Sequence, residues 1–478
     1  MDKGDEEIKP HIGVFDGVSI IAGIVIGVGI FKAPLMVYSN VSSPWVGLAV
    51  WFLGGVLAFI GALCFAELAS AYPRSGGDYV YLTRAFGPFT GFMFGWAQIT
   101  VLFTGSIGVM AFVFADYFIQ LFHPGNGNGD INVVQSHELW GTTLAILSTA
   151  LLTILHIAGL ILGKAVQNIL TSFKVVGLTL IVLVGVLWGN GLEAATAVGE
   201  STPPQTSIGF ALIMVLYAFG GWNDAALISS EVKDPSRTIV RILLLGTGGV
   251  CAIYLLINLG YIWGLGFENL RTSATPATDL VRMVAGNHAG QIMAILVSIS
   301  ALGAMHGLIY TGSRIYAVLG EDFKVFRFLS YRHTKAQTPL WALGALGGGT
   351  IFLTVVVGTQ AGRLVMDRMS KLISGATIPW ETYGGRFETL VSGTAPVFWF
   401  FFLLTGISVF VLRHKEPETP RPFRIPLYPV TPFVFCATSG YMLYSSIQWA
   451  KWLTLLGVLP LFAGVLGYAV LMKRKEPA

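Results

Sequence analysis

Residues 17–38 read GVSIIAGIVIGVGIFKAPLMVY, an apolar run that is interrupted by Gly27, Gly29 and Pro34. A helix needs roughly 20 apolar residues to cross a bilayer, so the run predicts one membrane span. The interruptions near its middle predict two half-helices with a break between them. At such a break, N–H groups at the start of one half-helix can hold an anion, and carbonyls at the end of the other can hold a cation.

A second interrupted run occupies residues 207–230 and reads SIGFALIMVLYAFGGWNDAALISS, with its break at Gly220 and Gly221. Glycine is common in membrane helices and often marks close helix packing, which is the alternative explanation for either break. Two breaks near mid-span, at the heads of two successive groups of five spans, favour a substrate site instead. A ligand with both a carboxylate and an amine, such as a zwitterionic amino acid, suits the two ends.

The composition places both runs in a membrane protein. Hydrophobic residues make up 54% of the 478-residue chain and charged residues only 11%, against about 25% charged in a typical soluble domain. Neither a soluble globule nor a disordered chain fits these values. We therefore predict an all-α polytopic membrane protein with about 12 transmembrane helices. The expected spans are 12–38, 44–72, 88–121, 139–157, 165–188, 207–230, 240–263, 289–318, 339–357, 388–412, 429–447 and 452–472.

An even number of spans places both termini on one side of the membrane. Most lysines and arginines between spans fall on that side, which predicts that both termini are cytoplasmic. The expected location is the plasma (cell inner) membrane. The loop at about 358–387 is expected outside, where it either carries a short helix or is disordered. The expected units are a tail at 1–11, five spans at 12–188, five spans at 207–412, two spans at 429–472 and a tail at 473–478.

Several function classes lack their usual sequence signals. The chain has no H-E-x-x-H metal pair, no G-x-S-x-G nucleophile elbow and no P-loop, so neither an enzyme nor direct use of ATP is expected. Its cysteines, Cys64, Cys251 and Cys436, lie in apolar runs without a zinc or disulfide spacing. No basic block suggests nucleic acid. We expect no cofactor, no metal and no nucleic-acid partner.

Five motifs occur in order along the chain: IGVGIF at 26–31, AELASAYPRSGGDYVYL at 66–82, YAFGGWN at 217–223, EVKDPSRTIVR at 231–241 and VLRHKEPETPRPFRIPLYP at 411–429. Together they resemble the amino acid–polyamine–organocation (APC) superfamily, most closely its L-type amino acid transporter-like branch. The resemblance covers nearly the whole chain. It implies a LeuT-like 5+5 inverted repeat with discontinuous helices 1 and 6, followed by two further helices. It also implies transport of amino acids by alternating access.

The resemblance implies a substrate site at the two breaks. The substrate carboxylate would meet backbone amides around Val28, and the amine would meet carbonyls near Ile24 and Tyr217, with Tyr217 also in the position of a gate. Three residues depart from the family pattern: Val28 replaces serine, Tyr217 replaces phenylalanine, and His306 stands where asparagine is frequent. These departures bear on which amino acid is bound. The implied substrate-binding residues are Ile24, Gly27, Val28, Gly29, Ile30, Tyr217, Phe219, Gly220, Trp222 and Asn223.

Lys174 falls near the bilayer centre in the fifth span, where a lysine costs about 2.5–3.5 kcal/mol on insertion scales. It is expected to brace helices by donating to backbone carbonyls, to exchange protons during transport, or to do both, because the two roles are not exclusive. The resemblance places it where sodium-coupled relatives bind sodium, bridging spans one, five and eight, with Ser300 as a candidate partner. His306 is expected to be either a buried, hydrogen-bonded neutral histidine or part of a proton relay.

Glu67 and Arg314 lie near the cytoplasmic ends of spans two and eight. They are expected to form either a gate pair or helix-end charges that face lipid headgroups. Trp399 in the tenth span matches a family tryptophan, so it is a candidate gate residue or a core packing residue.

We predict a secondary active transporter (permease) that works either as an exchanger or as a proton-coupled symporter. Asp224 is the only acidic residue near the breaks, which favours neutral L-amino acids as substrates. A cationic amino acid or polyamine permease is the alternative within this class, and a transporter-fold sensor or a channel the alternative outside it. The family that the chain resembles includes heteromeric members, which use a cysteine in the loop corresponding to 122–138 to join an ancillary subunit. This loop has no cysteine, so the resemblance implies no disulfide-linked ancillary subunit. The expected partners are the amino acid, the lipid bilayer and, for a symporter, protons.

Overall fold

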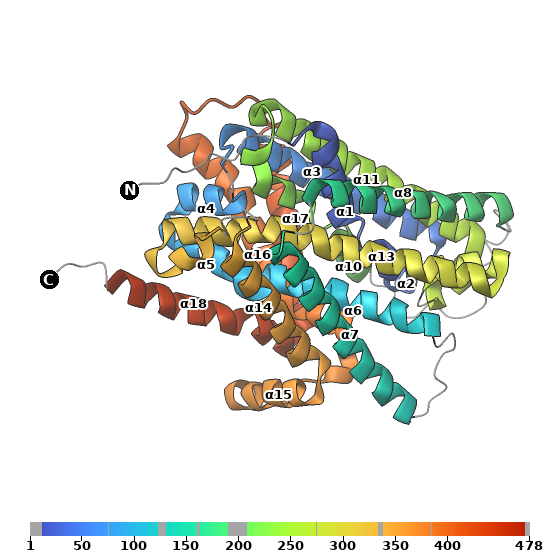
Figure 1. The fold of residues 1–478 in the computed structure, drawn as a ribbon. Coiled ribbons are helices and arrows are strands. Elements are labelled where there is room, and N and C mark those ends of the chain that lie inside the picture. Colours follow the sequence, from blue (N-terminus) through green and yellow to red (C-terminus); the bar gives the residue numbers. More distant parts are fainter. Residues whose placement is uncertain are drawn as a thin grey trace.

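The computed structural model describes residues 12–74, 76–122, 131–159, 163–189, 208–273, 275–332, 338–383 and 385–473. The expected tail at 1–11, residues 474–478 of the expected tail at 473–478, and residues 123–130 of the loop at 122–138 therefore lie outside the described residues. Within the described ranges the chain forms helices and two isolated β-bridges, without a strand. The all-α fold class is confirmed (Figure 1).

Ten described helices are long and apolar enough to cross a membrane, or eleven when one bent pair counts as a single span. The last of the ten, Val430–Val470, contains two helices that a left-handed residue, Lys451 (φ 45°), separates. Counting these two apart gives the twelve expected segments. In chain order they are α1 (Val14–Val25) with α2 (Gly29–Tyr38), α3 (Pro44–Ala71), α5 (Pro88–Ala97) with η1 (Gln98–Leu102) and α6 (Phe103–Phe122), α7 (Ile131–Ile157), α8 (Gly163–Trp188), α10 (Ile208–Ala218) with η2 (Trp222–Glu231), α11 (Pro235–Leu265), α13 (Pro276–Asp322), α14 (Leu340–Gly358), α16 (Arg386–Lys415), α17 (Val430–Ala450) and α18 (Leu455–Lys473).

Both predicted breaks are present. The first span consists of α1 and α2, which meet at an angle of 47°. In the sixth span, α10 ends at Ala218 and Gly221 adopts a φ of 103°, a left-handed conformation that glycine reaches without steric cost. The second half of this span, η2, is a 3-10 helix. Its backbone therefore differs from the ordinary α-helix that an apolar run suggests.

The connections between spans are more ordered than their sequences alone require. The segment at 73–87 contains helix α4 (Asp78–Phe86), and the outer loop at 358–387 carries α15 (Gln360–Ser374) and a short 3-10 turn, η4 (Trp380–Tyr383). Short helices also follow α11, as α12 (Phe267–Thr272), and α13, as η3 (Lys324–Ser330).

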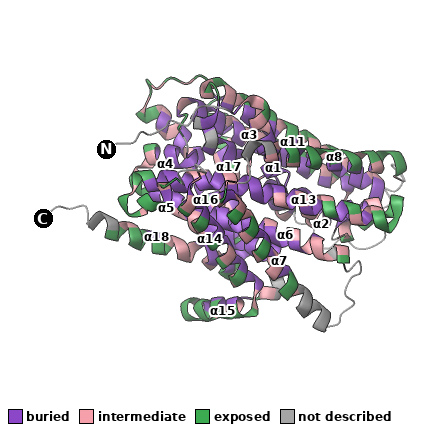
Figure 2. Ribbon diagram, viewed as in Figure 1, coloured by how far each residue is buried: buried purple, intermediate pink, exposed green. Residues whose placement is uncertain are grey.

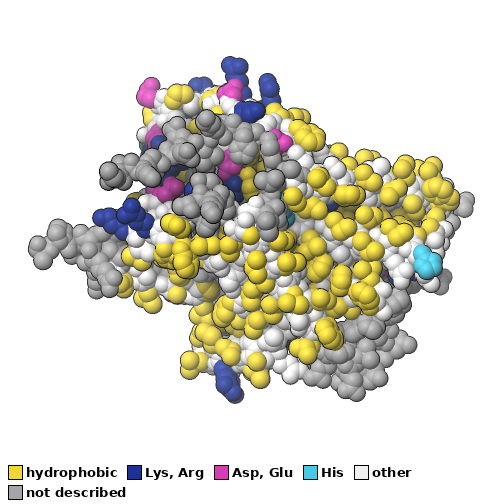
Figure 3. Space-filling model, viewed as in Figure 1, with side chains coloured by type: hydrophobic (Ala, Val, Ile, Leu, Met, Phe, Trp, Pro, Cys, Tyr) yellow, Lys and Arg dark blue, Asp and Glu magenta, His cyan; other side chains and the backbone are white. Residues whose placement is uncertain are grey.

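The two broken helices lie at the centre of the bundle. Helix α1 packs against α8, α11 and α13, while α10 packs against α2 and α3. Figure 2 shows buried residues along these central helices and exposed ones on the outer helices. The visible outer face is largely hydrophobic (Figure 3), as a lipid-facing surface requires.

Candidate substrate site at the two helix breaks

The break in the first span leaves unused hydrogen-bond donors. The amide of Gly27 donates to the Val25 carbonyl (2.7 Å), and the first amide of α2 with a nearby acceptor is that of Phe31, which donates to Val28 (3.0 Å). In the described part of the chain, no backbone acceptor pairs with the N–H groups of Val28, Gly29 and Ile30. These are the free donors of a helix N-terminus, and together they favour an anionic ligand.

The break in the sixth span lies directly against the first. A Cβ atom added to Gly29 would come within 2.8 Å of the Ala218 Cα, so only glycine allows the two chains to approach this closely. The amide of Gly220 donates to the Tyr217 carbonyl (2.9 Å), whereas the Ile24 carbonyl accepts no hydrogen bond from the described residues. Of the two carbonyls expected to meet an amine, that of Ile24 is therefore the more available.

Tyr254 of α11 joins the two breaks, and this role was not predicted from the sequence. Its hydroxyl lies 2.6 Å from the Val25 carbonyl and 3.2 Å from the Ala218 carbonyl, and its side chain is fully buried. One O–H group is thus shared by the last carbonyls of α1 and α10. No motif reveals such a residue, because a tyrosine in an apolar run has the same pattern as a packing residue.

One cavity lies between the breaks. Five of the predicted substrate-binding residues, Ile24, Gly29, Tyr217, Gly220 and Asn223, line it, and so does the gate candidate Trp399. The other polar side chains of the lining are Asp78, Gln98, Ser106, Asp224 and Thr394, and its apolar wall includes Met110, Leu308, Phe398 and Phe402.

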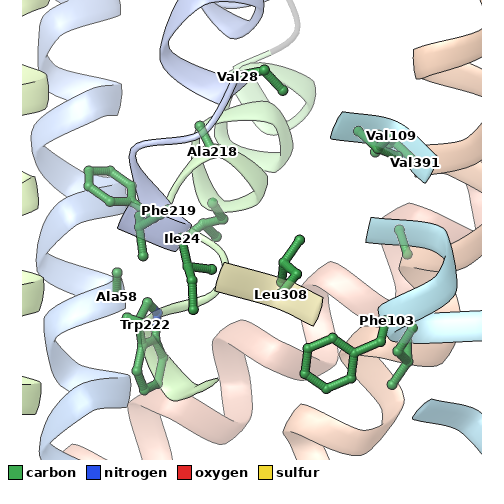
Figure 4. Close-up of a cluster of buried hydrophobic side chains, with 14 of the residues drawn as sticks. Ile24, Val28, Ala58, Phe103, Val109, Ala218, Phe219, Trp222, Leu308 and Val391 are labelled. Carbon is green, nitrogen blue, oxygen red and sulfur yellow. The ribbon is translucent and has the colours of Figure 1, made fainter. Parts of the chain in front are cut away.

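The remaining predicted binding residues surround this cavity without lining it. Phe219 packs edge-on against Trp51 (6.0 Å between ring centroids), and Trp222 packs edge-on against Phe65 (5.0 Å). Figure 4 shows Trp222 beside Ala58 of α3. Gly27, Val28 and Ile30 are absent from the lining, so among the three free N–H groups at the first break only that of Gly29 belongs to a residue that lines the cavity.

Lys174 and Ser300 both bind the backbone at the first break. The Lys174 ammonium donates to the Gly23 carbonyl (2.6 Å), and the Ser300 hydroxyl donates to the Ile26 carbonyl (3.3 Å). Since Lys174 lies on α8 and also contacts Gly303 of α13, spans one, five and eight meet at its side chain. The printed hydrogen bond of Lys174 is to α1, and among the described residues no hydrogen bond joins Lys174 to Ser300.

Glu67 and Arg314 do not pair with each other, so the expected gate pair requires correction. The Glu67 carboxylate is 2.7 Å from Arg413 Nε and also accepts the Ile425 amide (2.7 Å). Arg314 instead binds the Glu231 carboxylate at 2.8 Å. Glu67 is 2% exposed, so it does not face headgroups either. The position of each charged residue along its helix predicted its depth in the membrane. The packing of the helices determined which residue it pairs with.

His306 is buried and hydrogen-bonded, which was one of the two expectations for it. Its Nδ1 lies 2.8 Å from the Gln167 Oε1, and its ring centroid is 4.8 Å from that of His156. Its Nε2 and that of His156 lack a partner among the described residues. His156 of α7, which packs against the His306 ring, was not predicted from the sequence.

Asp78 is the second acidic residue at the cavity, and it was also not singled out from the sequence. It belongs to α4, outside the spans, and accepts a hydrogen bond from the Thr405 hydroxyl (2.7 Å). Burial raises the pKa of Asp78 to about 6, although hydrogen bonds from Thr405 and Asn223 partly offset the shift. The described residues contain no cluster of three or more metal-ligating side chains.

Comparisons with known proteins identify the family of the chain. The family model described as amino acid permease matches residues 12–470. The chain is 28% identical to the b(0,+)-type amino acid transporter 1 of Homo sapiens, over 98% of this chain and 89% of that protein. It is 26% identical to the serine/threonine exchanger SteT of Bacillus subtilis (strain 168), over 99% of this chain and all of that one. It is 29% identical to the large neutral amino acids transporter small subunit 2 of Rattus norvegicus, over 91% of this chain and 76% of that protein. The two broken helices and the match along almost the whole chain lead to one conclusion: this protein belongs to the amino acid permease family of the APC superfamily and is a transporter, not an enzyme.

Proposed function

We propose that this protein exchanges neutral amino acids across the plasma membrane by alternating access. The observation that carries the proposal is the pair of unsatisfied backbone ends at one cavity. Ile24 and Gly29 both line this cavity. The free N–H group of Gly29, with those of Val28 and Ile30 beside it, suits a carboxylate, and the free carbonyl of Ile24 suits an amine. Exchange is favoured over proton symport because one relative is named as a serine/threonine exchanger.

Within this proposal, Lys174 braces α1 through the Gly23 carbonyl and can exchange protons when the bundle rearranges. Its bond to a backbone carbonyl next to the break supports both roles, because movement of α1 would break it. The protein is proposed to act without a disulfide-linked subunit, since the outer loop at 122–138 contains no cysteine. Both termini are proposed to face the cytoplasm.

The test is uptake into proteoliposomes that contain the purified full-length chain. We expect a labelled neutral amino acid to enter only when unlabelled amino acid is present inside. Uptake into empty vesicles, driven by a pH gradient alone, would replace exchange with proton symport. Folded protein that takes up no member of a full amino acid panel under either condition would overturn the transport proposal.

A matched pair of glycine substitutions connects uptake to the site. Gly29→Ala places a Cβ atom 2.8 Å from the Ala218 Cα. A Cβ atom added to Gly249 would have no neighbouring atom within 4 Å. We expect Gly29→Ala to lower uptake at least tenfold and Gly249→Ala to change it less than twofold. Equal effects would show that the breaks do not form the substrate site.

A further inference from the structure

Helix α15 lies at the edge of the bundle, directly after the membrane-spanning helix α14 (Figure 1). A single residue, Thr359, separates the two helices, and its hydroxyl caps α15 by accepting the Gly362 amide (3.1 Å). α15 has 15 residues, fewer than the roughly 20 that a helix needs to cross a bilayer. It therefore begins at the membrane surface and is too short to cross the membrane.

One side of α15 is fixed to the bundle. Met366 and Ser370 are four residues apart, so they share a face of the helix, and both are buried. Arg363 Nε donates to the Val357 carbonyl of α14 (3.0 Å), and the Arg363 guanidinium lies 3.7 Å from the Glu138 carboxylate of α7. These contacts set which side of α15 faces away from the protein.

The side that faces away carries large apolar side chains. Leu372 is 88% exposed, and Leu364, Val365 and Ile373 are each more than half exposed. Val365, Met369 and Leu372 follow one another at i, i+4 and i+7, so these five residues form a continuous apolar stripe. Figure 3 shows hydrophobic side chains and a basic one at the lower edge of the molecule, where Figure 1 places α15. A contiguous exposed stripe of this kind marks a contact with another apolar surface.

The free charges of α15 are positive. The Asp367 carboxylate is already used within the protein, because it accepts the Ile378 amide (3.1 Å) and the Trp380 indole N–H (3.0 Å). Arg368 and Lys371 are exposed, lie three residues apart at the edge of the apolar stripe, and have no ion-pair partner among the described residues. The partner of this face therefore combines an apolar surface with negative charge.

A phospholipid supplies both parts. Its acyl chains match the apolar stripe, and its phosphate matches an arginine and a lysine. The long stems of Arg368 and Lys371 can follow the stripe while their charges reach the headgroups, and amphipathic helices with basic edges lie in this region of a membrane. A second copy of the chain suits the face less well, because a symmetric contact would bring the same positive charges together.

We propose that α15 is an interfacial helix: its apolar stripe lies among the acyl chains of the adjacent leaflet, and Arg368 and Lys371 bind the phosphate groups of anionic phospholipids. This inference does not depend on the proposed transport activity. Since Asp367 joins α15 to η4 through Trp380, the lipid contact also positions the segment that leads into α16. Helix α16 contributes Trp399 to the wall of the central cavity.

The depth of the stripe is measured with a nitroxide on Leu372→Cys, in the full-length chain with its three natural cysteines changed to alanine. The vesicles contain equal parts of phosphatidylcholine and phosphatidylglycerol. We expect oxygen, which concentrates in the acyl chains, to relax this nitroxide more than a water-soluble nickel chelate does. Gln360→Cys shares the polar face of Asp367 and Lys371 and should show the reverse order. Stronger relaxation of the Leu372→Cys nitroxide by nickel would overturn the proposal.

The lipid class is measured with a bimane fluorophore on the same Leu372→Cys protein. In the mixed vesicles, either the phosphatidylglycerol or the phosphatidylcholine carries bromine, which quenches bimane on contact. We expect brominated phosphatidylglycerol to quench at least twofold more strongly. Arg368→Gln combined with Lys371→Gln should bring the ratio to about one. The matched control is Lys324→Gln combined with Arg327→Gln, an exposed pair with the same spacing on η3, and it should leave the ratio unchanged.

Equal quenching by the two lipids in the protein that keeps Arg368 and Lys371 would overturn the binding of anionic lipid, whether or not the double variant folds. Quenching by neither lipid would overturn the membrane contact itself. Disulfide-linked dimers of the unlabelled Leu372→Cys protein, formed in the vesicles in place of lipid contact, would assign the stripe to a second copy of the chain. None of these measurements requires transport, so failure of the proposed function would leave each outcome readable.

Discussion

Tyr254 is the residue on which the geometry of both breaks depends. Its hydroxyl is within hydrogen-bond distance of the Val25 and Ala218 carbonyls, and its ring packs edge-on against Trp51 with centroids 5.7 Å apart. Phenylalanine at this position would keep the ring contact and lose only the hydroxyl. The hydroxyl therefore has an effect that can be separated from packing.

We expect Tyr254→Phe to destabilise the protein by about 1 kcal/mol, because one buried hydrogen bond is lost. Substrate should also raise the melting temperature less than it does in the unmodified protein, because the two breaks are no longer joined. Thermal melting in detergent, with and without amino acid, measures both effects. Tyr444→Phe removes a hydroxyl from a side chain that is 63% exposed and should change neither.

The burial of Asp78 predicts that ligand binding at the cavity depends on pH. Burial raises the pKa of its carboxyl from 3.8 to about 6, so it gains a proton on acidification well before an exposed aspartate would. Protonation removes a negative charge from the cavity. Lysine should therefore inhibit the uptake of a labelled neutral amino acid less strongly as the pH falls through about 6. Inhibition by norleucine, measured in the same vesicles, should change less over this range. Parallel pH profiles for the two ligands would contradict the role of Asp78.

At the scale of elements, the half-helices α1 and η2 of the two broken spans are joined to each other. The amide of Ile12, just before α1, donates to the Glu231 carbonyl at the end of η2 (2.9 Å), and the Lys233 amide donates to the Ile12 carbonyl (3.0 Å). Glu231 also binds Arg314 of α13. The half-helices α1 and η2 are therefore expected to move as one unit when the cytoplasmic side opens.

Glu231→Gln would leave the Arg314 guanidinium, whose side chain is 20% exposed, without its carboxylate. We expect a destabilisation of about 3 kcal/mol, because a buried charge that loses its partner is more costly than the absence of both charges. Glu231→Gln combined with Arg314→Met should be more stable than Glu231→Gln alone. Melting temperatures of the three proteins test this, and additive losses would show that the pair does not interact energetically.

The elements also show how much of the fold local sequence could predict. Apolar length and interrupting glycines predicted both broken spans, because these signals act within one segment. The 3-10 geometry of η2 and the helix α4 that carries Asp78 were not predicted. Both depend on what packs against them: the Asp78 carboxylate, for example, is held by Thr405 of α16, far along the chain.

At the scale of the whole molecule, the distribution of basic residues predicts both termini in the cytoplasm. Single cysteines, in a background where the three natural cysteines are alanine, test this in intact cells. Gln360→Cys, at the start of α15, should react with a membrane-impermeant maleimide. Glu418→Cys, in the exposed connection after α16, should react only after permeabilisation. The reverse pattern would invert the proposed orientation.

The sequence alone determined that this protein is a bundle of membrane helices with two breaks, because hydrophobic length and backbone interruption are local properties. Its motifs also identified the family. Only the tertiary structure decided which side chains meet at the breaks: Tyr254 on two carbonyls, Lys174 on Gly23, Glu67 with Arg413, and Asp78 beside Asp224 in one cavity. The physical reason is that helices which are apolar on most faces carry little periodic signal of which neighbour they face. Close packing at small residues determines which helices are neighbours. The neighbouring helices then determine which polar side chains form hydrogen bonds and ion pairs.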